Sequence, residues 1–144
     1  MKNSLRTVAV AILYQEGKFL MQLRDNIPTI IYPGHWGFFG GHLEPDETPT
    51  QGVKREVLEE INYELKNPTL FRRQTDDVAI RYVFYEPLTV PLTQLVLQEG
   101  ADLALVSPEA IQQGACYSTK LKQIFPLGTI HQKILLDFMQ FLLE

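Results

Sequence analysis

Three glutamates, Glu56, Glu59 and Glu60, have the spacing and the chemistry of a divalent-metal site. In a helix, at about 100° per residue, their carboxylates fall within about 100° of arc on one side. Glu56 and Glu60 are four residues apart, and such a like-charge pair costs an isolated helix about 0.2–0.5 kcal/mol. Crowded carboxylates are the hard oxygen ligands that Mg²⁺ and Mn²⁺ prefer. The string EVLEE by itself is compatible with a metal site, but a solvated acidic face is its simpler interpretation, and the longer pattern around it decides between the two.

The residues that flank these glutamates indicate where their helix begins and ends. Thr48 has the side chain of an N-cap, and Pro49 suits the first helical position, where a missing N–H breaks no hydrogen bond. The helix is expected to run to about Ile61, because Asn62 tolerates the left-handed conformation that ends helices. An adjoining apolar stripe consists of Val53, Val57 and Ile61. The acidic face thus borders the buried face, as expected of a cleft wall.

The glutamates belong to a longer pattern that starts at a double glycine. It reads Gly41, five residues, Glu47, seven residues, and then REVLEEINY from Arg55 to Tyr63. This pattern resembles the Nudix box of the Nudix hydrolase family, G-x5-E-x7-R-E-U-x-E-E-x-G-U, in which U is apolar. Every fixed polar position matches, whereas Asn62 replaces the last glycine and Tyr63 fills an aliphatic position. Asparagine is the next-best left-handed residue, so the turn is expected to survive.

The resemblance implies a role for each matched position. The family's metal-ligating carboxylates correspond to Glu56, Glu59 and Glu60. Gly40 corresponds to the residue whose backbone carbonyl completes the metal site. Arg55 and Glu47 correspond to an internal ion pair that ties the loop to the helix. The implied cofactor is Mg²⁺, with Mn²⁺ as a substitute, and Glu59 is also a candidate catalytic group.

Glu99 is the second candidate catalytic group. It precedes Gly100 and an apolar strand, Leu103 to Val106, which is followed by a short helix from Pro108 to Gln112. This order resembles the loop of MutT-type Nudix proteins in which a distant glutamate approaches the metals. The resemblance implies a metal ligand or a general base at this position, and an ordinary turn glutamate is the alternative.

The rest of the chain predicts strands and one further helix. The predicted strands are Thr7 to Tyr14, Lys18 to Leu23, Leu70 to Gln74 and Val78 to Tyr85. Thr129 to Glu144 has the apolar spacing of an amphipathic helix, whereas Gly114 to Leu127 shows no clear pattern. These elements indicate an α/β (α+β) fold. The resemblance sharpens it to a Nudix-type α/β/α sandwich around a mixed β-sheet, with residues 1–144 as one domain.

Three residues outside the box are weaker candidates for substrate contacts. Arg24 opens a proline-containing loop, Arg24 to Gly34, and has the charge to reach a phosphate, although an exposed arginine is more often plain surface. Trp36 and Phe38 lie in an aromatic strand, His35 to Phe39, and have the rings to stack on a nucleobase. Core aromatic residues are the equally simple alternative. His42 and His131 are most simply surface residues.

Composition narrows the class of partner. Of the 144 residues 45% are apolar and 21% are charged, and the formal net charge of −4 gives no basic footprint for duplex nucleic acid. The single cysteine, Cys116, excludes an internal disulfide. No apolar run is long enough to span a bilayer, and the N-terminus lacks the pattern of a signal peptide, so the cytoplasm is the expected location. The apolar C-terminal helix is compatible with docking on the core or in a homodimer.

The resemblance implies hydrolysis of a nucleoside diphosphate linked to another group, by attack of a metal-activated water on phosphorus. The small chain and its MutT-like loop favour a nucleoside triphosphate as the substrate. A nucleotide sugar, ADP-ribose and a dinucleoside polyphosphate are the alternative substrates. A non-catalytic nucleotide-binding domain and an acidic metal-binding protein without diphosphate chemistry are the alternative functions.

Overall fold

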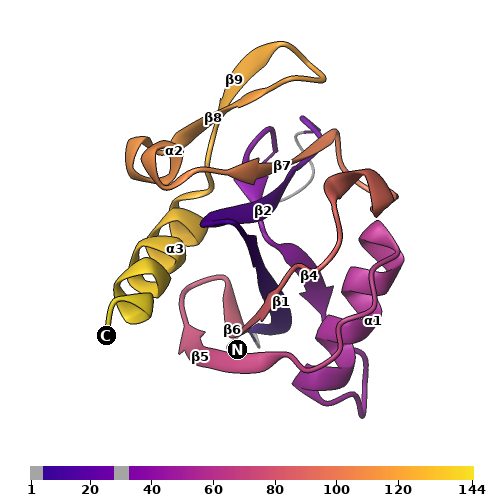
Figure 1. Ribbon diagram of the computed structural model, residues 1–144. Coiled ribbons are helices and arrows are strands. Elements are labelled where there is room, and N and C mark those ends of the chain that lie inside the picture. The colour runs from indigo at the N-terminus through magenta and orange to yellow at the C-terminus, as the bar shows by residue number, and fades with distance from the viewer. Residues whose placement is uncertain (1–4, 28–32) are drawn as a thin grey trace. The chain divides into compact units, whose positions relative to one another are not determined.

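Residues 5–27 and 33–144 are described by the computed structural model (Figure 1). Part of the predicted loop Arg24 to Gly34, residues 28–32, lies outside them. The chain groups into two units, the first comprising Met1–Leu13 and Phe39–Gln98 and the second Tyr14–Phe38 and Glu99–Glu144. A single domain over residues 1–144 stays a prediction.

The described residues of the first unit form four strands. They are β1 (Arg6–Gln15, whose last two residues belong to the second unit), β4 (Phe39–His42), β5 (Thr69–Thr75) and β6 (Ala79–Pro87). β4 pairs antiparallel with β1, with Val8 opposite His42 and Ala11 opposite Phe39. β6 is hydrogen-bonded to both β1 and β5. The β-branched and apolar residues that predicted β1 form a buried strand, in which Ile12 and Leu13 are 0% exposed.

Helix α1 (Pro49–Ile61) packs on β4 in the same unit. Thr48 is its N-cap, and the side-chain oxygen of Thr48 accepts the N–H of Gln51 at 3.1 Å. Asn62 ends the helix in the left-handed region with φ of 55°. The predicted start, end and C-terminal conformation of this helix are therefore confirmed. The apolar stripe Val53, Val57 and Ile61 is buried as predicted. A short 3₁₀ helix, η1 (Leu92–Gln94), also belongs to this unit.

The second unit holds the remaining elements. They are β2 (Lys18–Leu23), β3 (Trp36–Gly37), β7 (Asp102–Val106), α2 (Pro108–Gln113), β8 (Ala115–Ser118), β9 (Gln123–Pro126) and α3 (Thr129–Leu142). β2 pairs antiparallel with β3 and with β7. β8 and β9 form a hairpin, which the sequence pattern did not predict. The expected aromatic strand His35 to Phe39 is divided into β3 and β4.

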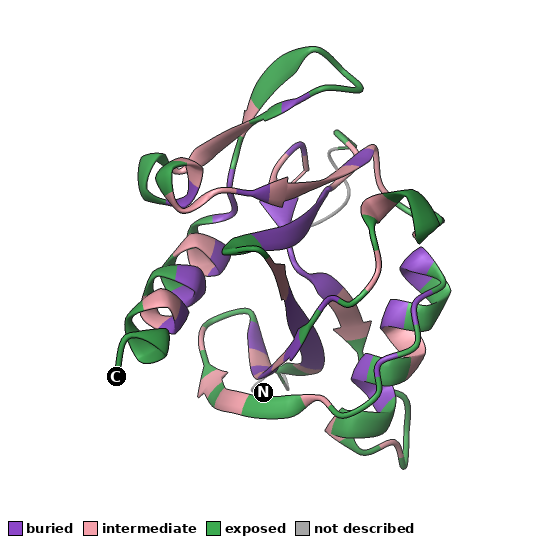
Figure 2. Ribbon diagram, viewed as in Figure 1, coloured by how far each residue is buried: buried purple, intermediate pink, exposed green. Residues whose placement is uncertain are grey.

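Helix α3 buries one side against its own unit, as Figure 2 shows. Ile134, Leu135 and Phe138 are at most 1% exposed. His131 is also buried, at 8% exposure, so its expected surface position is wrong. Its Nδ1 accepts the N–H of Phe38 at 3.3 Å, and the ring lies over two glycines, Gly37 and Gly128, that leave room for it.

Helices and strands occur in both units, so the predicted α+β class is confirmed. None of the helices in the described ranges is long and apolar enough to cross a membrane.

Candidate active site

Helix α1 presents the three predicted carboxylates in three different environments. The side chain of Glu59 is 60% exposed, whereas that of Glu56 is 18% exposed. Glu60 is buried at 4% exposure. A buried carboxylate needs hydrogen bonds to offset the loss of water. Glu60 is thus a fixed anchor of the helix, and Glu59 faces solvent.

Glu60 ties α1 to β4 and to the segment after η1. Its Oε1 accepts the backbone N–H of Gly40 at 2.9 Å. Its backbone carbonyl accepts the N–H of Gln98 at 2.8 Å. Gly40 has φ of 141°, and a Cβ there would overlap the backbone carbonyl of Ala9. Only glycine fits this position, and it brings the β4 backbone within hydrogen-bond distance of the buried carboxylate. The role of the Gly40 carbonyl as a metal ligand stays a prediction.

The second glycine of the pair makes room for another carboxylate. A Cβ on Gly41 would lie 2.7 Å from the carboxylate of Glu56. The backbone of β4 and the α1 carboxylates are therefore in direct contact along this double glycine. Gly52, one turn before Glu56, packs against the loop, because a Cβ there would meet the side chains of Leu43 and Glu47.

Arg55 is the centre of the charge network in this unit. Its Nε donates to Glu47 Oε2 at 2.7 Å and its Nη2 to Glu47 Oε1 at 3.0 Å. Its Nη1 donates to Glu56 at 3.0 Å and to Glu59 at 3.2 Å. The structure thus brings Arg55 and Glu47 together in a bidentate pair, as the resemblance implied. It also shows two contacts, with Glu56 and Glu59, that the sequence analysis did not foresee.

These contacts shift the pKa of both members of the pair. The hydrogen bond from Arg55 is the largest cause that lowers the pKa of Glu47 to about 2, with help from the N–H of Glu44. The same hydrogen bond to Glu47, and a smaller one to Glu56, raise the pKa of Arg55 above its ordinary value. Both groups are charged at neutral pH, and the loop is held on the helix by a full ion pair.

The chemistry of the donors suits a divalent cation. Carboxylate oxygens and a nearby backbone carbonyl are hard ligands of the kind that Mg²⁺ takes. Across residues 5–27 and 33–144, no three Asp, Glu, His or Cys side chains converge as a coordination site. Glu56 and Glu59 share the Arg55 guanidinium, so a cationic group already lies against two of the predicted ligands.

The other predicted site residues lie in the second unit. Glu99 is exposed and precedes Gly100, which has φ of 96°. Arg24 is half-buried, and its backbone N–H donates to the carbonyl of His35 at 3.0 Å. The catalytic role of Glu99 and the phosphate contact of Arg24 stay predictions.

The two aromatic candidates are interior residues of that unit. Trp36 is 0% exposed, and its Nε1 donates to the carbonyl of Cys116 at 3.0 Å. Phe38 is 3% exposed, with its ring centroid 4.9 Å from that of His131. These positions are those expected of core aromatics, and stacking on a nucleobase stays a prediction.

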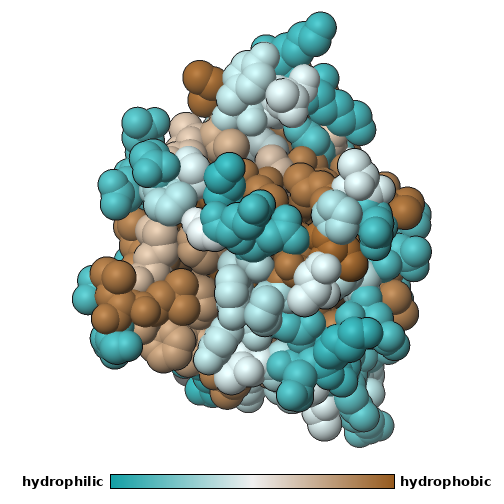
Figure 3. Space-filling model, viewed as in Figure 1, coloured by the Kyte–Doolittle hydropathy of each residue, from teal (hydrophilic) through white to brown (hydrophobic). Residues whose placement is uncertain are grey.

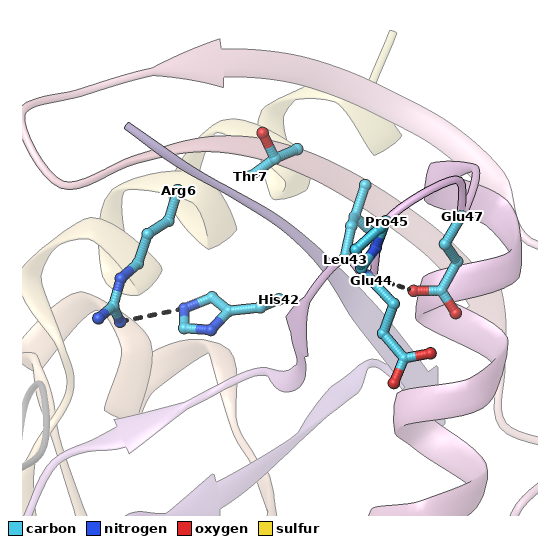
Figure 4. Close-up of a pocket in the computed structure, with 7 residues that line it drawn as sticks. All are labelled: Arg6, Thr7, His42, Leu43, Glu44, Pro45 and Glu47. Carbon is cyan, nitrogen blue, oxygen red and sulfur yellow. Dashed lines mark hydrogen bonds between the residues drawn. The ribbon is translucent and has the colours of Figure 1, made fainter. Parts of the chain in front are cut away.

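An open pocket of about 470 Å³ lies beside the loop between β4 and α1 (Figure 4). It is lined by Arg6, Thr7, His42, Leu43, Glu44, Pro45 and Glu47. Arg6 Nη1 donates to His42 Nε2 at 3.2 Å. Partial burial, followed by the charge of Arg6, lowers the pKa of His42. No sequence pattern pointed to Arg6, and the signal for His42 was its place next to the double glycine.

Comparisons with known proteins agree with this geometry. A family model described as NUDIX domain matches residues 4–127. The relative "Nucleoside triphosphatase NudI" of Enterobacter sp. (strain 638) is 25% identical over 120 residues, covering 74% of this chain and 84% of the relative. The crystal structure of the MutT protein from Methanosarcina mazei Go1 is similar with a TM-score of 0.73 and 21% identity, covering 97% of this chain and 96% of that one.

A third similar structure was solved with a ligand. The NUDIX domain of Shewanella oneidensis NrtR, complexed with ADP ribose, has a TM-score of 0.73 and 17% identity over 98% of this chain and 90% of that one. Fold, box and family model together define a Nudix-type domain. The chain belongs to the NUDIX domain family, and its enzyme class is that of the Nudix pyrophosphohydrolases. The predicted family and fold class are thereby confirmed.

Proposed function

We propose that this chain hydrolyses a diphosphate linkage in a nucleoside triphosphate, using a divalent metal held by Glu56, Glu59 and Glu60. The observation that carries the proposal is the complete carboxylate set on α1, placed against the double glycine of β4. The name of the NudI relatives supports nucleoside triphosphates as the substrate class. When bound, Mg²⁺ supplies charge neutralisation on the phosphate oxygens and lowers the pKa of a bound water.

The carboxylates of the proposed site have different roles. Glu60, buried and hydrogen-bonded to Gly40, fixes the distance between α1 and β4. Glu56 and Glu59 would hold the cation with their carboxylates, and Arg55 has its bidentate contact with Glu47 as a second anchor. In the hydrolysis a water oxygen bonds to phosphorus, the bridging P–O bond breaks, and the proton of the water passes to a carboxylate. Glu59 and Glu99 are the candidates for that acceptor.

Two alternatives remain attached to specific observations. The NrtR domain was solved with ADP ribose, which favours ADP-ribose as a second substrate candidate for this chain, beside nucleotide sugars and dinucleoside polyphosphates. A non-catalytic nucleotide-binding domain is the alternative outside the enzymes. The intact acidic set argues against it, because binding alone does not require three carboxylates.

The test measures phosphate and pyrophosphate release from a panel of these four substrate classes with Mg²⁺, and again with EDTA. Glu60→Gln is the informative variant, because glutamine keeps an oxygen that can accept the Gly40 N–H but loses the charge. We expect its rate to fall about 100-fold or more. Glu109→Gln, an exposed carboxylate on α2, is the matched control and keeps the wild-type rate.

The outcomes separate the alternatives. Release that needs metal and is lost in Glu60→Gln supports the hydrolase, and the best substrate identifies the subclass. A folded Glu60→Gln with full activity would refute the proposed metal site. Absence of release from every substrate, together with a nucleotide-induced rise in Tm that persists in EDTA, would instead establish a binding domain.

A further inference from the structure

The two faces of strand β4 present different chemistry. Gly41 and Leu43 both face α1, since a Cβ on Gly41 would meet Glu56 and a Cβ on Gly52 would meet Leu43. Side chains alternate along a strand, so His42, between them, points to the opposite face. The His42 ring and the α1 carboxylates are therefore on different sides of β4.

Arg6 shares the face of His42. Val8 lies directly opposite His42 in the β1–β4 pair, and Arg6 is two residues before Val8 on the same face of β1. The guanidinium reaches across the strands to the ring, as Figure 4 shows, with 3.2 Å between Nη1 and Nε2. Two strands of one pair thus position this contact.

The pair retains a full positive charge. A guanidinium has no acceptor, so Nε2 of His42 must accept and the ring is the neutral tautomer with its hydrogen on Nδ1. Within the described part of the chain, no carboxylate forms an ion pair with Arg6, and the Arg55 network engages the two pocket glutamates, Glu44 and Glu47. Among the described residues the Arg6 guanidinium is thus free of an ion pair, whereas the two carboxylates in the lining are contacted by Arg55.

The pocket has the size and lining of a small-ligand site. Its volume of about 470 Å³ falls in the range of about 300–1,000 Å³ that such sites occupy. Pro45 adds apolar surface to the lining. Guanidinium N–H groups match the oxygens of a phosphate in geometry and charge.

We propose that the pocket formed by Arg6 and His42 binds the phosphate group of a small molecule, at a site distinct from the carboxylate face of α1. The guanidinium of Arg6 provides the charge and paired donors, and Pro45 offers apolar surface to whatever group the phosphate carries. This site does not depend on divalent metal or on turnover, so it stands or falls independently of the proposed hydrolysis.

The experiment titrates the protein in EDTA with inorganic phosphate, with pyrophosphate and with adenosine 5′-monophosphate, followed by calorimetry and by ¹⁵N-resolved NMR shifts. EDTA removes the contribution of metal at the carboxylates. We expect saturable binding that perturbs the amide signals of Thr7, His42 and Leu43. Tighter binding of the nucleotide would assign a role to the apolar surface, and equal binding would assign the site to the free anion.

Arg6→Gln is the informative variant because Arg6 is exposed and its loss leaves the core intact. Its affinity for all three probes is expected to fall at least about tenfold, the loss of one charge-assisted hydrogen bond. Arg73→Gln removes the same charge from an exposed position on β5 and keeps the wild-type affinity. Equal affinity in Arg6→Gln and wild type, or no binding of any probe at tens of millimolar, would overturn the proposal.

Discussion

At the scale of single residues, Arg55 explains how two of the three carboxylates, Glu56 and Glu59, coexist on one helix. The resemblance implied its pair with Glu47, but not its contacts with Glu56 and Glu59. Residues one apart on a helix do not face each other as a rule, so spacing alone did not connect Arg55 with Glu56. In the structure the bidentate pair with Glu47 holds the guanidinium where its Nη1 reaches Glu56. The sequence therefore indicated the members of this network but not all of its connections.

The Glu47–Arg55 pair predicts a specific pH dependence of stability. The pKa of Glu47 is lowered from 4.5 to about 2 in the folded chain, chiefly by the hydrogen bond from Arg55. A lowered pKa stabilises the folded state fully above about pH 4.5, and that contribution is lost as the pH falls toward 2. Urea unfolding of wild type and Glu47→Gln between pH 3 and 7 checks this.

We expect the free-energy difference between these two proteins to be largest above pH 4.5, the ordinary pKa, and to shrink at lower pH. Glu64→Gln, which removes an exposed carboxylate outside the box, is the matched control. A wild-type to Glu47→Gln difference that stays constant down to pH 3 would show that the pair does not act through its charge.

At the scale of elements, the spacing of apolar residues predicted α1, β1 and α3 but did not predict β8 and β9. The stretch Gly114 to Leu127 lacks the alternation of apolar and polar residues that indicates a strand. Its turn contains Lys122 with φ of 58°, a left-handed conformation that a lysine in the sequence does not predict. The burial of His131 could not be predicted from its neighbours in the helix either, because the ring packs on Gly37, which is remote in sequence. Local pattern predicts elements, whereas such contacts depend on how the elements pack.

The double glycine of β4 predicts two different outcomes for the same substitution. Gly40 has φ of 141°, which alanine rarely adopts, and the Cβ of Gly40→Ala would overlap the backbone of Ala9. We therefore expect this variant to lose about 3 kcal/mol or more in stability. Gly41→Ala would place its Cβ against the carboxylate of Glu56, the mobile end of a side chain. We expect that variant to stay within about 1 kcal/mol of wild type in stability but to lose hydrolysis.

Denaturant unfolding and the pyrophosphate assay, run on both variants, check this contrast. If Gly41→Ala were as unstable as Gly40→Ala, Glu56 would be a rigid structural residue and not a carboxylate free to move onto a cation. If Gly41→Ala kept full activity, the position of Glu56 would not matter for the reaction.

At the scale of the whole chain, hydrophobic side chains gather on the surface at the C-terminal end of α3, as Figure 3 shows. The exposed ones in this region are Leu136, Phe141, Leu142 and Leu143. The amphipathic pattern predicted the helix, but its last turn extends beyond the buried stripe. The homodimer considered from the sequence stays a prediction.

The balance of charge in the chain predicts that a divalent cation stabilises it. The net charge is −4, and three carboxylates crowd one helix, of which Glu56 and Glu59 share Arg55 as their counter-charge. A cation that binds only the folded state adds about 2.7 kcal/mol at one hundred times its Kd. We therefore expect Mg²⁺ to raise the Tm relative to EDTA, by more than NaCl of equal ionic strength.

Glu59→Gln tests whether the stabilisation arises at α1. This side chain is 60% exposed, so its replacement leaves the packing of the helix unchanged. The Tm of the variant in EDTA should stay close to that of wild type, because the loss of one repelling charge offsets the loss of the exposed contact with Arg55. The increment from Mg²⁺ should be smaller. An equal increment in both proteins would place the cation elsewhere on the chain, since a ligand lost from the coordinating set must weaken binding.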